Sequence, residues 1–301
     1  MSGDFSLPVV HNAVGIMAPF LLAAVGGLFT ELAGMLNIAL EGLMLIGAFS
    51  SVVFASATGS LFLGVLFGIL SSVLIAYLFG FVSLKLKANV FISGLATNLL
   101  ASGLTVVLAF KLFGSKGVIQ FPDAPRLPVL SIPALQRVPL LGDLFIGHNV
   151  LVYFSWIFLV LAAVVIYKTP FGLRIRATGH DSSTVESVGL KPSRYQMEAI
   201  LVSGFACGAA GSMLTLNLQA FVPNITSGRG WIALVVIYLG NKKPLGILIA
   251  SFVFGCAESI SNYAQGFINI PADFILAFPY IITVIAMVGY SAVRHYRAKK
   301  V

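Results

Sequence analysis

Charged residues are scarce in this sequence. Asp, Glu, Lys and Arg make up 9% of the 301 residues, against about 25% in an average soluble domain. Hydrophobic residues make up 58%, and the mean hydropathy is +1.00. This composition excludes an ordinary soluble protein and predicts an all-α polytopic membrane protein with a single transmembrane domain over residues 1–301.

Basic residues are missing from the first part of the chain, and cysteines are few throughout. No Lys or Arg precedes Lys85, so a charged signal-peptide region is lacking, and we expect the first apolar run to be retained. Cys207 and Cys256 lie inside apolar runs and are typical of small buried hydrophobic residues. The net charge of +8 indicates loops that face an anionic inner leaflet, and no nucleic acid partner is predicted.

The motifs of several enzyme classes are also absent. No G-x-x-x-x-G-K-[ST] sequence occurs, which excludes ATP binding by a phosphate loop. Neither a nucleophile elbow nor an H-E-x-x-H sequence is found. The four histidines are far apart and no cysteines cluster, so a metal-ligand pattern is missing. These absences argue against an enzyme that acts on its own and predict no cofactor in this chain.

Nine apolar runs approach the length of about 20 residues that a spanning helix needs. The short run 230–241 and the interrupted run near 31–42 could be re-entrant, so we predict about eight or nine transmembrane helices. The runs cover residues 12–30, 38–57, 60–84, 89–112, 149–167, 198–218, 230–241, 245–264 and 272–290.

The distribution of basic residues predicts the orientation. Thirteen of the 18 Lys and Arg residues share one side if Lys85 and Lys87, the 168–197 loop, the Lys242-Lys243 pair and the tail after residue 290 lie together. The side richer in Lys and Arg is cytoplasmic. We therefore predict a cytoplasmic C-terminus and an outward-facing loop over 113–148, which is rich in proline.

The 168–197 loop contains a short predicted helix. Ser183 and Glu186 have the spacing of a capping box, and Gly189 offers the left-handed position that ends a helix. A helix of barely two turns is marginal alone in water, so we expect a partner to dock on it. An ordinary basic loop with a capped turn accounts for the spacing equally well.

Two interrupted, glycine-bearing segments hint at an internal duplication. One covers residues 31–42, and the other runs from Thr226 to Gly240. Interrupted segments at matching places of two halves indicate a transport site, because half-helix ends offer dipoles and free backbone groups to a polar solute. The halves would be a first repeat over about 12–112 and a second over about 149–290. Coincidence among the 30 glycines is the alternative.

Polar and aromatic side chains in or beside apolar runs are candidates for a solute pathway. An acid at the bilayer centre costs about 2.5–3.5 kcal/mol on insertion scales, so Glu41 and Glu258 should face a cavity or a partner. Membrane amides can pair with a base or sugar, although they more commonly join helices. The candidates are Asn37, Glu41, Asn98, Asn217, Arg229, Trp231, Glu258 and Asn262.

Three stretches carry a resemblance to a known family: ELAGMLNIALEGLMLIGAF (31–49), ATGHDSSTVESVGLKPSRY (177–195) and TSGRGWIALVVIYLGNKKPLG (226–246). Together they resemble membrane permease subunits of bacterial ABC importers of the ribose/branched-chain-amino-acid type. Within that type they are most similar to permeases of nucleoside uptake systems that are fed by a basic-membrane-lipoprotein-type binding protein.

The resemblance implies two inverted repeats, a permease dimer (often with a related permease) and a location in the bacterial cytoplasmic (inner) membrane. It implies cytoplasmic ATPase subunits, which hold ATP and Mg, and an extracytoplasmic substrate-binding lipoprotein. Val188 and Leu190 stand where the family often has Ala and Ile, which leaves the choice of partner open. The implied ATPase-coupling helix consists of Ser183, Thr184, Val185, Glu186, Ser187, Val188, Gly189 and Leu190.

Other functions remain to be weighed. A proton-coupled secondary transporter would use Glu41 or Glu258 as the proton carrier, but it leaves the capped helix without a role. A membrane scaffold leaves the paired interrupted segments unexplained. Within the resemblance, nucleosides (purine nucleosides favoured) are predicted over a sugar or a branched-chain amino acid.

Overall fold

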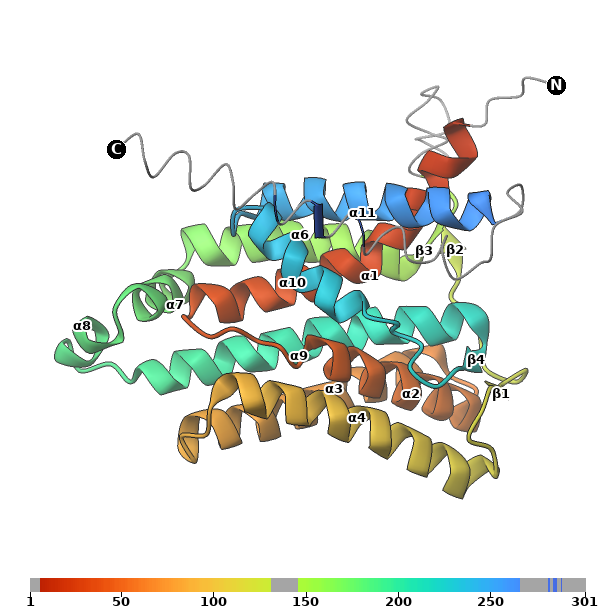
Figure 1. Cartoon of the computed structure of the whole chain (residues 1–301), viewed down its shortest axis with the longest axis horizontal. Coiled ribbons are helices and arrows are strands. Elements are labelled where there is room, and N and C mark those ends of the chain that lie inside the picture. The colour runs from red at the N-terminus through yellow and green to blue at the C-terminus, as the bar shows by residue number, and fades with distance from the viewer. Residues whose placement is uncertain (1–5, 131–145, 266–280, 282–283, 286–287, 289–301) are drawn as a thin grey trace.

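Seven helices in the described part of the chain are long and apolar enough to cross a membrane (Figure 1). The computed structural model describes residues 6–130, 146–265 and the isolated helical positions 281, 284, 285 and 288. The multi-pass helical architecture predicted from composition is confirmed, while the predicted run 272–290 lies almost entirely outside the described residues. The seven helices are α1 (Ser6–Leu32), α2 (Leu40–Thr58), α3 (Leu61–Gly80), α4 (Val90–Phe113), α6 (Val150–Lys168), α9 (Pro192–Leu218) and α11 (Pro244–Ala264).

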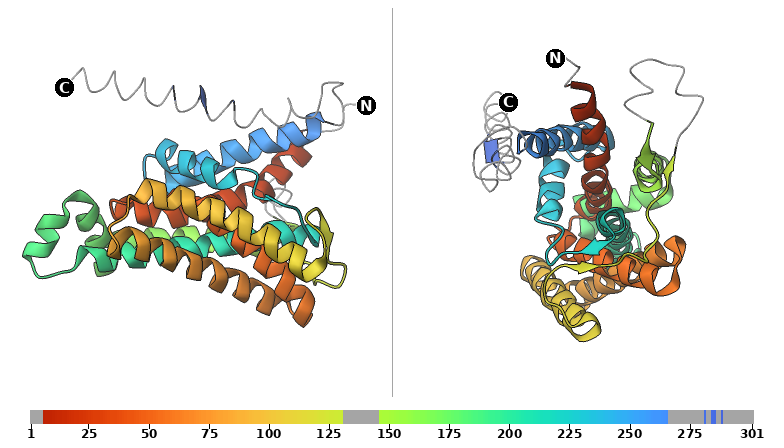
Figure 2. Two further views of the ribbon diagram at one scale, coloured as in Figure 1. Left: turned by 60° about the horizontal axis from the view of Figure 1, so that its bottom comes forward. Right: turned by 90° about the vertical axis from the view of Figure 1, so that its right-hand side faces the viewer.

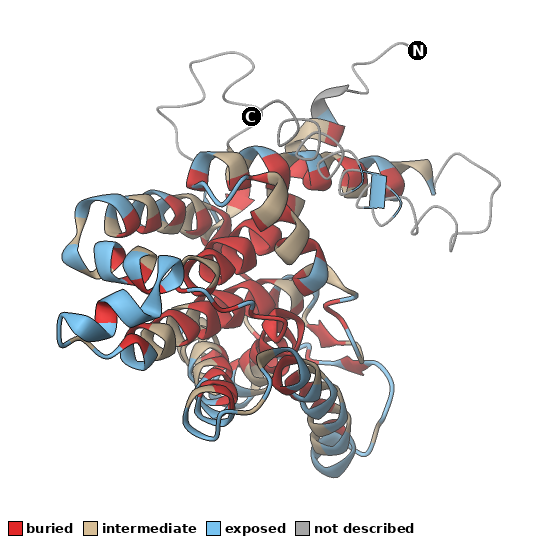
Figure 3. Ribbon diagram, turned by 60° about the vertical axis from the view of Figure 1, so that its left-hand side comes forward, coloured by how far each residue is buried: buried red, intermediate tan, exposed pale blue. Residues whose placement is uncertain are grey.

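The centre of the bundle is formed by α1, α2 and α9, whose residues are mostly buried, whereas α3, α4 and α6 keep apolar faces exposed (Figure 3). Outward-facing side chains such as Phe62 and Leu99 are exposed, as expected of a surface that lies in lipid. Glycines let the central helices approach closely: a Cβ on Gly47 of α2 would lie 2.7 Å from Gly208 Cα of α9.

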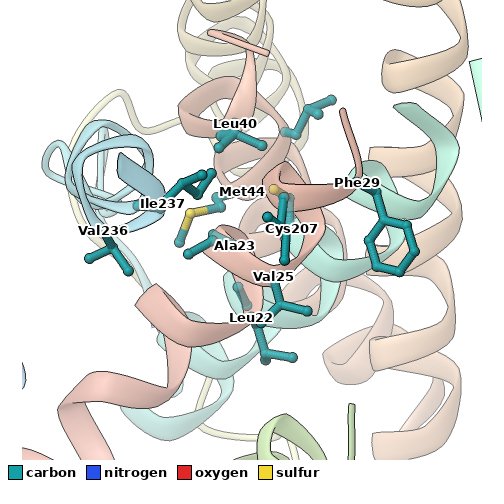
Figure 4. Packing of buried hydrophobic residues seen from close by; sticks show 14 of the residues in the cluster. Leu22, Ala23, Val25, Phe29, Leu40, Met44, Cys207, Val236 and Ile237 are labelled. Atoms are coloured by element: carbon teal, nitrogen blue, oxygen red, sulfur yellow. The ribbon is translucent and has the colours of Figure 1, made fainter. Parts of the chain in front are cut away.

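A short apolar helix, α10 (Arg229–Leu239), completes the described bundle beside α1 and α11. Its Val236 and Ile237 pack with Leu22 and Ala23 of α1 and with other buried side chains of α2 and α9 (Figure 4). Cys207 lies within the same cluster as a free thiol, which confirms its prediction as a small buried residue, whereas Cys256 of α11 is only half-buried and the same prediction is wrong for it.

The connections gather at the two ends of the bundle (Figure 1). At one end β1 (Ile119–Gln120) pairs antiparallel with β4 (Ala220–Phe221), and β2 (Val129–Leu130) pairs antiparallel with β3 (His148–Asn149). At the other end α7 (Pro170–His180) and α8 (Ser182–Ser187) project beyond the long helices (Figure 2).

Most of the predicted 168–197 loop is helical. Besides α7 and α8, it contains the first turns of α9, which begins at Pro192 and therefore earlier than the predicted run 198–218. Proline has no amide hydrogen to lose at the first position of a helix, which explains the early start. A π-helical turn, η1 (Phe81–Lys85), extends α3 at the same end of the bundle.

Candidate functional site

The first interrupted segment, residues 31–42, is non-helical over residues 33–39, between α1 and α2. Gly34 adopts a φ of +78°, a conformation that favours glycine and prevents α1 from continuing. Asn37 is buried: its Oδ1 accepts a hydrogen bond from the Ala39 amide (3.0 Å), and its Nδ2 donates to Ser203 Oγ (2.7 Å). Asn37 therefore ties the extended backbone to α9.

Asn98 of α4 holds the other side of this segment. Its Nδ2 donates to the Ile38 carbonyl (2.9 Å), and its Oδ1 accepts from the Gly42 amide (2.8 Å). Interrupting a helix leaves backbone groups without intrahelical partners, and membrane amides commonly satisfy such groups. The structure thus gives Asn37 and Asn98 roles in stabilising the interruption, and their predicted contact with a solute stays a prediction.

Glu41, in the first turn of α2, reaches across to the second interrupted segment. Its Oε1 accepts hydrogen bonds from Thr226 Oγ1 (2.5 Å) and the Gly228 amide (2.8 Å). Its Oε2 accepts from the Gly230 amide (2.6 Å). The carboxylate, 8% exposed, therefore binds the amino end of α10, where free N–H groups and the helix dipole favour a negative charge.

The two interrupted segments consequently touch. A Cβ on Gly230 would lie 2.4 Å from the Glu41 amide nitrogen and 2.5 Å from its Cα, so only glycine permits this approach. Gly228, with a φ of +81°, turns the chain into α10 immediately before the contact. The sequence pattern predicted two interruptions, and the structure places them against each other in the interior.

A cavity of about 460 Å³ lies at the end of the bundle that carries the β-strands. Residues of α1, α6, α9, α10 and α11, together with β2 and β3, line it. Four of the eight predicted pathway residues meet there although they come from three helices: Asn217, Arg229, Glu258 and Asn262.

The only charges among these four residues neutralise each other. Arg229 and Glu258 form an ion pair through Arg229 Nη2 and Glu258 Oε1, and both side chains are largely buried. Arg229 Nη1 also donates to the Ile225 carbonyl (3.1 Å), so the guanidinium is fixed to the turn that precedes α10. The pair therefore connects the second interrupted segment with α11.

Further polar residues line the cavity that sequence reasoning missed. Asn149 Nδ2 donates to Asn217 Oδ1 (3.3 Å), and the His11 and His148 rings stack with their centroids 4.3 Å apart. Asn12 Nδ2 donates to the Tyr263 hydroxyl (3.0 Å) at the edge of the cavity. These residues lie near helix ends, where polar side chains are ordinary, so only their convergence from separate elements distinguishes them.

Trp231 lies apart from the cavity. It is 41% exposed on the first turn of α10 and is not among the residues that line the cavity. Its predicted role as an aromatic contact for solute therefore finds no support from its position and stays a prediction.

The start of α8 differs from the sequence prediction. Asp181, rather than Ser183, caps the helix: Asp181 Oδ1 accepts from the Ser183 amide (2.9 Å) and hydroxyl (2.7 Å), and Oδ2 accepts from Thr184 Oγ1 (2.6 Å). The predicted capping box is therefore wrong, because the Ser183 hydroxyl is engaged with Asp181. The hydrogen bonds from Thr184 and Ser183 lower the pKa of the Asp181 carboxyl to about 2.

The end of α8 is as predicted. Gly189 has a φ of +81°, its amide donates to the Glu186 carbonyl (2.9 Å), and the Leu190 amide donates to the Val185 carbonyl (3.2 Å). Val185 is buried against the protein, whereas Val188 is 69% exposed. Together with the exposed polar side chains of α8, Val188 offers a surface at the tip of the projection (Figures 1 and 2).

The projection packs directly on the first interrupted segment. A Cβ on Gly179, near the end of α7, would lie 2.1 Å from the Leu32 carbonyl oxygen and 2.7 Å from the Gly34 amide nitrogen. Gln196 Nε2 of α9 donates to the Ala33 carbonyl in the same place (3.3 Å). α7 and the segment that leads to Glu41 are therefore in direct backbone contact, with no room for a side chain between them.

Comparison with known proteins identifies the family of the chain. A family model described as branched-chain amino acid transport system / permease component matches residues 9–287. The nucleoside ABC transporter permease protein NupC of Lactococcus lactis is 31% identical over 93% of this chain and 90% of its own length. The guanosine ABC transporter permease protein NupQ of Bacillus subtilis is 32% identical over 94% and 91%.

A third relative, the putative glucose ABC transporter permease protein TsgC13 of Haloferax volcanii, is 30% identical over 87% of this chain and 79% of its own length. No solved structure matches the chain significantly. The family match covers most of the chain, including both interrupted segments and the α7–α8 projection. The chain therefore belongs to the family of branched-chain amino acid transport system permease components, and it is an ABC transporter permease subunit, a transport component rather than an enzyme.

Proposed function

We propose that this chain is the membrane subunit of an ATP-driven importer that takes up nucleosides, with purine nucleosides favoured. NupC and NupQ, which are named for nucleosides and guanosine, align over at least 90% of both chains. Within the structure, the main support for this proposal is the chemistry of the cavity lining. Its lining is mixed, and the amides and imidazoles among its apolar residues suit a neutral solute with many hydrogen-bonding groups.

The size and charge of the cavity support the same class of solute. About 460 Å³ falls within the range of roughly 300–1,000 Å³ that is usual for small-molecule sites. A zwitterionic amino acid needs separate partners for its two charges, whereas Arg229 and Glu258 already pair with each other. A sugar shares the neutral chemistry of a nucleoside, and the name of the Haloferax relative keeps glucose as the solute to compare.

We infer that α8 transmits the action of the ATPase. ATP and Mg would be held by the partner chains, whose closure would displace the segment from Ser183 to Leu190. The close contact between Gly179 and Gly34 would pass that displacement to the interrupted segment and, through Glu41, to α10 and Arg229. The permease itself would be a conduit, since a change between states needs differential binding that α8 cannot supply alone.

The proposed assembly contains a second permease subunit, preferably a related chain, two cytoplasmic ATPase subunits and an extracytoplasmic substrate-binding lipoprotein. The permease would lie in the bacterial cytoplasmic membrane as two inverted repeats. Its α8 end and C-terminus would face the cytoplasm. This orientation agrees with the positions of Lys85, Lys87, Lys242 and Lys243 at the ends of helices.

Proton-coupled transport has less support. A carboxylate that carries protons must exchange its partners during the cycle. Glu41 instead accepts three hydrogen bonds from the start of α10, and Glu258 pairs with Arg229. Both carboxylates connect segments of the fold, so the ATP-driven mechanism accounts better for their positions.

The test is transport by the reconstituted complex in proteoliposomes, with ATP inside or outside and tritiated guanosine as solute. We expect uptake that requires ATP and the binding lipoprotein and that excess glucose or leucine does not inhibit. Asn262→Ala should raise the KM for guanosine, whereas Gln265→Ala, directly after the same helix but outside the cavity, should not. Uptake that is driven by a proton gradient without ATP would overturn the proposal.

A further inference from the structure

A second cavity, of about 410 Å³, lies at the opposite end of the bundle from the solute cavity. It is formed by the last turns of α3, by η1 and by the first turns of α9. One wall is apolar and the rim is polar and mostly basic. The lining residues are Tyr77, Phe81, Leu84 and Met197 on the wall, and Lys85, Lys191, Ser193, Arg194 and Glu198 on the rim.

This basic groove lies at the boundary of two membrane spans. One candidate span ends at Lys85, and the other begins at Pro192, directly after Lys191. The apolar wall therefore belongs to the last turns inside the membrane, where Tyr77 and Phe81 are 46% and 38% exposed. The wall faces hydrocarbon while the rim stands at the level of lipid headgroups.

The charge of the rim is unbalanced. Arg194 Nε pairs with Glu198 Oε1 (2.9 Å), so the one carboxylate of the groove is already engaged. Lys85 and Lys191 form no ion pair with any residue that the structure describes, and they come from the two sides of the groove. The amino end of α9 adds the positive end of a helix dipole beside Lys191.

We propose that this groove binds an anionic phospholipid, with the headgroup phosphate between Lys85 and Lys191 and an acyl chain along Tyr77 and Phe81. Basic pockets between membrane helices on the cytoplasmic side are suited to such headgroups. A free phosphate would leave the apolar wall uncovered, whereas a phospholipid satisfies both the cations and the wall. The inference does not rest on the identity of the transported solute.

A lipid bound in this groove would hold α3 and α9 together. Directly beneath the groove, a Cβ on Gly80 would lie 2.7 Å from Met197 Sδ and 3.2 Å from Ile200 Cδ1, so α3 and α9 are already in close contact there. A phosphate that bridges Lys85 and Lys191 would hold these helices together where α9 enters the membrane. That place directly follows α8, so the lipid would brace the base of the coupling projection.

The experiment is native mass spectrometry of the full-length chain in mild detergent, titrated with phosphatidylglycerol or phosphatidylcholine. We expect selective retention of phosphatidylglycerol, weakened on the order of tenfold in Lys85→Gln/Lys191→Gln. The matched control, Lys87→Gln/Lys168→Gln, removes the same charge at the same end of the bundle but outside the groove and should bind like the parent.

Three results would overturn the assignment. An equal loss of phosphatidylglycerol retention in both double variants would indicate that the lipid is attracted to basic residues in general rather than bound at one site. Unchanged binding in Lys85→Gln/Lys191→Gln would place the lipid elsewhere. Displacement of phosphatidylglycerol when the ATPase subunit is added would assign the groove to the ATPase.

Phe81→Ser, which keeps both lysines, offers an independent variant and should also weaken retention of phosphatidylglycerol, because it removes part of the apolar wall.

Discussion

Replacing Glu41 by Gln conserves the size of the side chain but should release the start of α10 from α2. The carboxylate accepts hydrogen bonds on both oxygens, from Thr226 and Gly228 on one and from Gly230 on the other. An amide offers one acceptor oxygen and one donor nitrogen. If the amide oxygen keeps Thr226 and Gly228, its nitrogen must face the Gly230 N–H, which is then left without an acceptor.

The free-energy cost of Glu41→Gln depends on the burial of the Glu41 side chain. An unsatisfied buried donor costs about 1–3 kcal/mol, and a hydrogen bond to a charged group contributes about 1.5–3 kcal/mol, more than a neutral one. Glu41 is 8% exposed, and the close approach of Gly230 leaves no room for water at the contact. We therefore expect Glu41→Gln to destabilise the folded permease by about 2–4 kcal/mol, a large share of the stability of a typical domain.

The assay is the apparent melting temperature of the purified complex in detergent, together with solute uptake by proteoliposomes. Glu198→Gln is the matched control, because Glu198 makes only an exposed pair with Arg194 that contributes about 0.3–0.5 kcal/mol. Glu41→Gln should melt clearly lower and transport poorly, and Glu198→Gln should melt like the parent. Equal melting temperatures for all three proteins would refute the role of Glu41 in holding α10.

Three further predictions concern the α7–α8 projection and its proposed coupling role. Gly179→Ala places a methyl group 2.1 Å from the Leu32 carbonyl oxygen, so the amount of solute taken up per ATP hydrolysed should fall. Gly103→Ala is the control, because its methyl group meets nothing within 4 Å and should leave that ratio unchanged. Equal ratios in the two variants would contradict direct transmission of movement from α7 to the first interrupted segment. Glu186→Pro should break α8 and abolish co-purification of the ATPase, while membrane insertion, measured by fractionation, persists. Normal co-purification of the ATPase would refute the docking role of α8. Hydrogen bonds lower the pKa of Asp181 to about 2, so the cap is complete above the ordinary value of 3.8 and is lost only as pH falls through about 2. The affinity for the ATPase should therefore depend on pH in the same way in Asp181→Asn as in the parent between about pH 5 and 8, although it should be lower overall. A different pH dependence in the two proteins would refute the conclusion that Asp181 stays ionised in this range.

Much of the architecture was accessible from the sequence because the bilayer imposes simple requirements. Long apolar runs must form spanning helices with satisfied backbones, and the predicted runs overlap the described long helices. Local chemistry was equally informative at the end of α8, where Gly189 takes the left-handed conformation. The start of that helix was misassigned because Asp181 and Ser183 are both good caps, and local pattern alone does not choose between them.

The sequence by itself thus determined the membrane class, the helical runs, the two interruptions and the short helix of the 168–197 loop. Only the tertiary structure decided what the polar residues do, because their partners are far away along the chain. Glu41 binds residues more than 180 positions later, and Asn98 stabilises an interruption more than 50 positions earlier. Asn217, Arg229, Glu258 and Asn262 share one cavity because three helices converge there. Hydropathy places a residue in the membrane, whereas helix packing determines whether its polar atoms meet another segment or open space.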